Sequence, residues 1–91
     1  MALVTVQLPA AFEGLADNRA IKVDAQTVSE AIAIVSSRYP LLSPRLCDEI
    51  GNPLPFVCYF VNHDDIRAHA GFNTPVTDGD SVIVVSAVAG G

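Results

Sequence analysis

The feature that most constrains the fold is a single amphipathic helix expected at residues 27–39. Thr27 and Glu30 stand three positions apart, the spacing of a capping box in which the two side chains satisfy amide donors at the helix start. Pro40 ends the helix, because a proline disfavours helical backbone in the residue before it. Between these signals the apolar residues recur at helical spacing and form one stripe that a sheet can cover: Val28, Ala31, Ile32, Val35 and Tyr39.

The remaining apolar segments have the length of strands. Alternation, or enrichment in β-branched and aromatic residues, predicts strands at 3–8, 20–23, 56–61 and 81–87, with a further short strand at 66–67. Connections are expected at 9–18, 62–65 and 78–80, the last as a hairpin-type turn. Pro44 favours a short helical turn from Ser43. One helix among several strands predicts an α+β fold, a mixed sheet of four to five strands with one principal helix packed on one face.

Composition narrows the class of protein. A chain of 91 residues suffices for one domain with one core, and 51% hydrophobic residues with a mean hydropathy of +0.41 exclude a disordered chain. Five basic against ten acidic side chains leave no basic stripe for phosphates, so we expect no nucleic-acid partner. No apolar run reaches membrane-spanning length, and the N-terminal residues lack the pattern of a secretory signal. The expected location is cytoplasmic, without membrane association.

The residue types that often mark catalytic or metal sites are poorly arranged for such chemistry. Cys47 and Cys58 lack the spacing of a CxxC motif, and we expect them to be idle thiols. His63 is followed directly by two aspartates, but adjacent residues in a turn point in different directions. Asp78 and Asp80 are expected to support a turn. The sequence therefore predicts no metal site and no permanently bound cofactor.

The sequence ends in two glycines that follow the last predicted strand. Glycines pack no side chain and lose the most backbone entropy on ordering, so residues 87–91 are expected to form a flexible tail after a domain at 1–86. Extended at about 3.3 Å per residue, the five tail residues reach roughly 16 Å. Gly90 and Gly91 carry no side chains that obstruct a narrow channel. A carboxylate needs activation before acyl transfer, and because the chain has no Gly-rich phosphate loop, another enzyme must supply it.

Three segments of the chain resemble the ubiquitin-like β-grasp sulfur carriers. That family includes the small subunit of molybdopterin synthase, the thiazole sulfur carrier and the carrier for cysteine synthesis. The resemblance covers nearly the whole chain and is strongest in Phe56-Val57 with Tyr59–Arg67, in Thr74–Val82 and in Ala87–Gly91. It implies a β-grasp fold, in which the first and last strands are adjacent and parallel at the centre of the sheet.

The resemblance also implies a function located at the C-terminus. Gly91 would be adenylated by a ubiquitin-activating-like enzyme that uses ATP, and then converted to a thiocarboxylate that carries sulfur covalently. Gly90, with Ala89 and Val88, would give the enzyme access to the end of the chain. The sulfur would pass to a biosynthetic enzyme that makes cysteine, molybdopterin or another sulfur-containing metabolite, and a sulfurtransferase is a further candidate partner. The chain would then be a protein co-substrate and not an enzyme.

Two other functions use the same features and stay open at this point. A ubiquitin-like modifier would be conjugated through Gly91 to lysines of other proteins, and a non-covalent regulatory subunit would not use the tail at all. Phe60 and Arg67 are candidate contacts for a partner protein. The expected core comprises Val4, Val6, Val28, Ile32, Val35, Phe60, Val82 and Val84.

Overall fold

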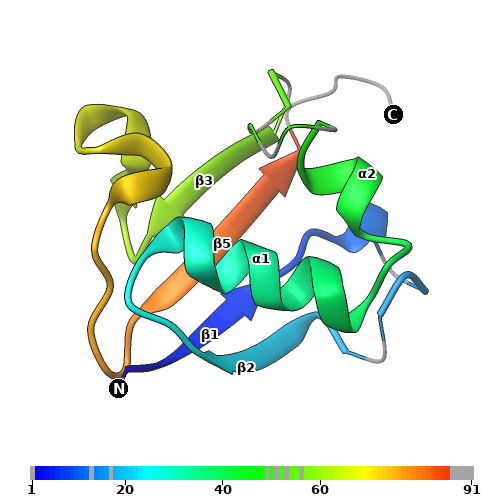
Figure 1. Ribbon diagram of the computed structural model, residues 1–91, viewed down its shortest axis with the longest axis horizontal. Coiled ribbons are helices and arrows are strands. Elements are labelled where there is room, and N and C mark those ends of the chain that lie inside the picture. Colours follow the sequence, from blue (N-terminus) through cyan, green and yellow to red (C-terminus); the bar gives the residue numbers. More distant parts are fainter. Residues whose placement is uncertain are drawn as a thin grey trace.

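The computed structural model describes residues 2–12, 14–16, 18–48, 50, 52, 54–55 and 57–86. A sheet forms one layer and the helix α1 crosses one of its faces (Figure 1). The strands are β1 (Leu3–Gln7), β2 (Ala20–Asp24), β3 (Val57–Val61), β4 (Asp64–Asp65) and β5 (Ser81–Ser86). The α-helices are α1 (Val28–Arg38) and α2 (Ser43–Leu46), and the 3-10 helices are η1 (Ala10–Phe12), η2 (Ile66–Ala68) and η3 (Gly71–Asn73). No helix of the described residues is both long and apolar enough to cross a membrane.

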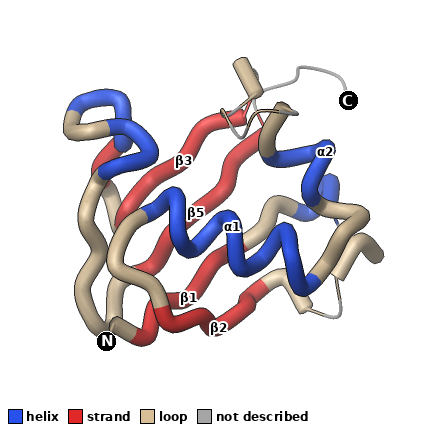
Figure 2. Tube along the Cα trace, viewed as in Figure 1, coloured by secondary structure: helices blue, strands red, loops and turns tan. Residues whose placement is uncertain are grey.

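The five strands form one mixed sheet in the order β2-β1-β5-β3-β4, shown in red in Figure 2. The chain's first and last strands are parallel neighbours, with Val6 opposite Val82. On its other side β5 pairs antiparallel with the whole of β3, from Val57 opposite Ser86 to Val61 opposite Val82. The expected mixed sheet, with its central parallel pair of terminal strands, is confirmed.

The helix α1 begins and ends where its sequence signals predict. The Thr27 hydroxyl accepts a hydrogen bond from the Glu30 amide at 3.1 Å, which satisfies one free donor of the first turn. The Glu30 carboxylate in turn accepts from the Gln26 amide at 3.3 Å, one residue before the position that a capping box predicts. At the other end the Tyr39 amide donates to the Val35 carbonyl at 2.9 Å. The short helix α2, with Pro44 in its first turn, is also confirmed.

The core lies between α1 and the sheet. Seven of the eight predicted core residues are buried: Val4, Val6, Val28, Ile32, Val35, Val82 and Val84. The prediction for Phe60 is wrong, because this side chain is only half-buried and Tyr59 occupies the core instead, 2% exposed. Strand β3 alternates buried and half-buried residues, and Phe60 falls in the outward phase. Residues 56–61 are apolar throughout, so the sequence contained no alternation from which to choose the phase.

Two local predictions also differ from the structure. Ile66 and Arg67 form the 3-10 helix η2 and not a strand, while Asp64 and Asp65 form β4 within the predicted turn. The Asp65 side chain accepts from the Arg67 amide at 2.9 Å, and this cap starts a helical turn where β-branched Ile66 suggested a strand. The turn at Gly79 (φ +90°) exists but is not a hairpin, because the antiparallel neighbour of β5 is β3.

Candidate functional site

The end of β5 positions the predicted site. Ser86 is the last residue that the structure describes, and it is held opposite Val57 of β3. Val88, Ala89, Gly90 and Gly91 lie outside the described residues, so the sulfur-attachment site and its access residues stay predictions. Because Gly91 follows Ser86 by five residues, an extended chain would carry its carboxylate up to about 16 Å from the sheet.

The sheet face opposite α1 carries an apolar patch beside the end of β5. Register places Phe60 opposite Ile83 and Cys58 opposite Val85. Phe60, Ile83 and Cys58 are half-buried, and Val85 is 40% exposed. We call Cys58, Phe60, Ile83 and Val85 the open-face patch. It follows β5 to within one residue of Ser86, so a protein bound there lies next to the last described residue before Gly91.

An ion pair borders the open-face patch. Arg67 places Nη2 2.7 Å from Asp65 Oδ2 and Nε 3.2 Å from both carboxylate oxygens. These hydrogen bonds lower the pKa of the Asp65 carboxyl and raise the pKa of Arg67. Asp65 lies opposite Phe60 in the β3–β4 pair, and the Arg67 side chain is 76% exposed. The structure therefore places the two predicted docking residues at one edge of the sheet, with an exposed guanidinium beside an apolar surface.

Sequence reasoning missed Ile83, Val85 and Cys58 as members of this patch. A signal for the first two was present, because residues 82–85 are apolar in both phases of a strand. Only one phase, Val82 and Val84, is buried under α1. The alternate residues Ile83 and Val85 therefore had to face solvent or be covered by a second layer of structure. Locating them beside Phe60 required the β3–β5 register, which no local pattern contains.

The remaining polar residues of interest serve structure. Within the described residues, no three histidine, cysteine or acidic side chains are grouped to hold a metal ion. His69 Nε2 lies 3.9 Å from Asp64 Oδ2, and both side chains are at least half exposed. Asp78 accepts from the Leu3 amide at 2.9 Å, which ties the last turn to β1. Asp80 accepts from the Thr77 amide at 2.8 Å, and chiefly this bond lowers the pKa of its carboxyl.

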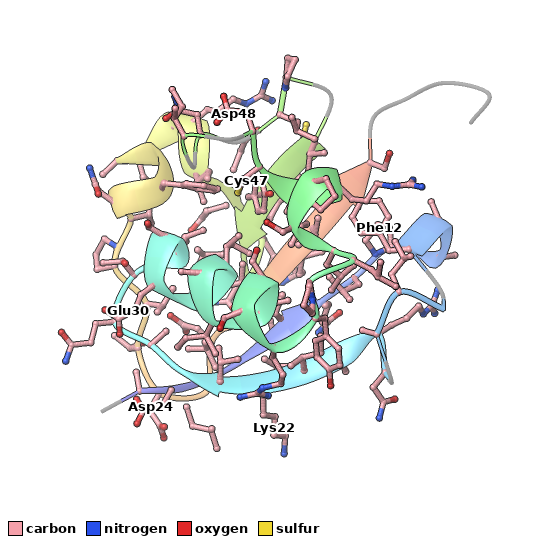
Figure 3. The ribbon with its side chains drawn as sticks, turned by 45° about the vertical axis from the view of Figure 1, so that its right-hand side comes forward. Phe12, Lys22, Asp24, Glu30, Cys47 and Asp48 are labelled. Atoms are coloured by element: carbon pink, nitrogen blue, oxygen red, sulfur yellow. The ribbon has the colours of Figure 1, made fainter. Side chains whose placement is uncertain are left out.

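Both cysteines are free and half-buried. Burial is the main cause that raises the pKa of the Cys47 thiol, which keeps it in the less nucleophilic neutral form near pH 7. Cys47 lies between α2 and the loop that follows it (Figure 3).

Comparison with solved structures defines the class of fold. The small archaeal modifier protein 1 of Methanosarcina acetivorans superposes with a TM-score of 0.89 at 22% identity, covering 100% of this chain and 98% of that one. A chain of the Amycolatopsis orientalis BexX/CysO complex gives a TM-score of 0.86 at 32% identity, over 97% and 99% of the two chains. The arrangement of sheet and helix is thus a ubiquitin-like β-grasp.

Comparison with sequences defines the family. Residues 6–91 match the ThiS family, and the chain belongs to that family. The sulfur carrier protein CysO of Mycobacterium tuberculosis is 33% identical over 91 residues, which cover 97% of this chain and 98% of that protein. The family match extends through the region that contains the two terminal glycines.

Proposed function

We propose that this chain is a sulfur carrier that holds sulfur as a thiocarboxylate on Gly91. The observation that carries the proposal is the similarity to sulfur carrier proteins along nearly the full length of both chains, with the family match reaching Gly91. The fold supports it, because β5 lies between β1 and β3 and stays paired with β3 as far as Ser86, so the residues that follow begin from a fixed position.

The chemistry needs two steps at the Gly91 carboxylate. In the first, a ubiquitin-activating-like enzyme binds ATP, and the carboxylate attacks the α-phosphorus to give an acyl adenylate with loss of pyrophosphate. In the second, hydrosulfide or an equivalent supplied by a sulfurtransferase attacks the acyl carbon, and AMP leaves. The thiocarboxylate is a better nucleophile than the carboxylate. It passes its sulfur to a cytoplasmic biosynthetic enzyme, for which cysteine and molybdopterin synthesis are the candidate routes.

The open-face patch supports a role in binding the activating enzyme. Its apolar surface lies beside the strand that leads to Gly91, so an enzyme docked there receives the tail at a fixed starting point. Phe60 would bury its ring in the partner. Arg67, whose side chain is 76% exposed, would pair with a partner carboxylate at the rim.

The test of the chemistry is intact-mass analysis after incubation with an activating enzyme, ATP and sulfide. The full chain should become about 16 Da heavier, the difference between sulfur and oxygen. A chain without Gly91 should gain no sulfur, because its carboxylate stops about 3.3 Å short of the phosphate that it must attack. Gly90→Val, which keeps the length but adds a branched side chain, should also fail, and both variants should melt like the parent protein. Equal sulfur loading of the truncated chain would refute the proposal.

The same assay separates the alternative functions. A ladder of isopeptide conjugates on other proteins, without the thiocarboxylate, would identify a ubiquitin-like modifier. Neither product would favour a non-covalent subunit.

The test of docking is the kinetics of adenylate formation. Phe60→Ala should raise KM for the carrier about tenfold while leaving kcat within about twofold, because it removes binding area and not a reacting group. Thr5→Ala, on the same sheet face but outside the patch, is the matched control. Equal KM values for the two variants would exclude the open-face patch as the docking surface.

A further inference from the structure

A second surface of the molecule, two strands away from β5 in the sheet order, has the features of a peptide-binding edge. Within the part of the chain that the structure describes, β2 is an outer strand and pairs only with β1. The Leu8 amide donates to the Arg19 carbonyl at 2.7 Å, and the Ala25 amide donates to the Ala2 carbonyl at 2.9 Å. In an antiparallel pair, the backbone N–H and C=O groups of alternate residues point to the partner strand, so those of the odd-numbered residues 19–25 point to β1. The backbone groups of three residues therefore point outward: Ala20, Lys22 and Asp24.

A groove lined by α1 side chains is linked to this outer edge by Arg38. The groove is an open hollow of about 390 Å³ between successive turns of α1. Its lining includes Glu30, the half-buried Ile34 and Arg38. The Arg38 side chain spans from the helix to the strand, because its Nη1 donates to the outward-facing Lys22 carbonyl at 3.2 Å. Arg38 thus connects the groove on α1 to the outward backbone of β2. Among the described residues, no strand of the sheet lies beyond β2.

Charge along this edge is ordered from one end to the other. Of the five basic residues in the sequence, Arg19, Lys22 and Arg38 lie around the start and middle of β2, all exposed. Asp24 and Glu30 lie at the opposite end, where β2 finishes and α1 begins. Figure 3 shows Lys22 and Asp24 on the side of β2 away from α1. A segment that binds along the edge would therefore meet cations at one end and carboxylates at the other.

We propose that the β2 edge and the α1 groove bind an extended segment of a partner protein, which adds to the sheet as a further strand outside β2. Its backbone would bond to Lys22, which gives up the contact with Arg38. One of its apolar side chains would enter the groove over Ile34. A carboxylate of the segment would then pair with the released Arg38 guanidinium. The site serves partner recognition and does not depend on chemistry at Gly91.

The charges favour a partner segment over a second copy of this chain. Two copies that pair their β2 strands around a two-fold axis through Lys22 would place the two Lys22 residues directly opposite each other. Like charges in that position destabilise a strand pair. An acidic segment would instead be attracted by the positive charges of Lys22 and Arg38. Charged side chains on an edge strand commonly serve to prevent pairing with other chains. The experiment must therefore distinguish a binding site from an edge whose charges only prevent aggregation.

The probe is a blocked peptide, acetyl-Thr-Val-Ile-Val-Asp-Glu-amide, titrated into the ¹⁵N-labelled full chain. Amide shifts are expected at residues 20, 22 and 24 of β2 and at residues 33–38 of α1. A control peptide that ends in Lys-Lys should bind at least about fivefold more weakly, because two attractive charge contacts become repulsive. Shifts confined to the open-face patch, or no shifts at all, would overturn the proposal. So would a peptide-independent dimer in analytical ultracentrifugation, which would assign the edge to a second copy.

Two variants at one position separate backbone recognition from charge. Lys22→Pro removes the outward amide but no hydrogen bond to β1, so the sheet is retained and peptide binding should fall by more than about tenfold. Lys22→Ala keeps the amide and should bind within about threefold of the parent chain. Equal binding by both variants would refute strand addition. If Lys22→Pro fails to fold, Arg38→Glu supplies the test, because it leaves the strand intact and should weaken binding of the acidic peptide while improving binding of the Lys-Lys peptide.

Discussion

Replacing Ile32 with alanine tests the packing of α1 on the sheet. Ile32 is 1% exposed and belongs to the core cluster that α1 forms with the strands. The substitution removes three buried carbon atoms at about 0.8 kcal/mol each and leaves a cavity, so unfolding should become easier by about 2–4 kcal/mol. A 91-residue domain is expected to have a total stability of about 5–14 kcal/mol, so this is a large fraction of it. The melting temperature should fall by more than about 10 °C.

Urea denaturation followed by circular dichroism measures the change, with Ile34→Ala as the matched control. Ile34 lies on the same helix but is only half-buried, so its replacement should cost about 1 kcal/mol or less. The denaturant slope should stay the same in both variants, because the surface exposed on unfolding hardly changes. If Ile32→Ala shifts the free energy of unfolding by less than about 0.5 kcal/mol, or no more than Ile34→Ala does, the core is not organised around this stripe.

Two further substitutions test polar contacts. Tyr59→Phe removes the hydrogen bond that the buried Tyr59 hydroxyl donates to the Leu46 carbonyl at 2.8 Å. The free energy of unfolding, measured by urea denaturation, should fall by about 1 kcal/mol, because the Leu46 carbonyl keeps its bond from the Leu54 amide. A loss above about 3 kcal/mol would contradict this reasoning. The lowered pKa of Asp80 stabilises the fold above the carboxyl's unfolded pKa of about 3.9, and this contribution is lost as pH falls through the folded pKa. Asp80→Asn should therefore show a smaller loss of stability between pH 7 and pH 3 than the parent chain, and an unchanged pH dependence would refute the assignment.

The parts of the fold that sequence predicted well depend on neighbours in the chain. The limits of α1 follow from the Thr27 cap and the apolar spacing, and both act within a few residues. The parallel pairing of β1 with β5 has no such local cause, and its prediction depended on family resemblance. The phase of β3 failed for a related reason. With apolar residues in every position, the sequence cannot choose the phase. Tertiary contacts place Tyr59 inward, where its hydroxyl donates to the Leu46 carbonyl and its ring packs against Phe72, and leave Phe60 outward.

The candidate site divides in the same way. The two terminal glycines are visible in the sequence, and their chemistry stays a prediction because Gly91 lies outside the described residues. The docking residues Phe60 and Arg67 were identified one by one, but the structure shows their relation: Asp65 holds the Arg67 guanidinium and lies opposite Phe60. The open-face patch as a surface, and the β2 edge with its groove, arise from strand register and helix packing. Neither can be inferred from spacing along the chain.

The position of β5 explains why stability and function can be separated in this chain. Its inward residues Val82 and Val84 are buried under α1, whereas Ile83 and Val85 face the opposite side. One strand therefore holds the core together with one set of side chains and offers a partner surface with the other. Because β5 is paired with β3 as far as Ser86, a protein bound at Val85 would meet the proposed reactive carboxylate six residues later, within about 20 Å. Substitutions in the inward set should change unfolding, and those in the outward set should change the encounter with the enzyme.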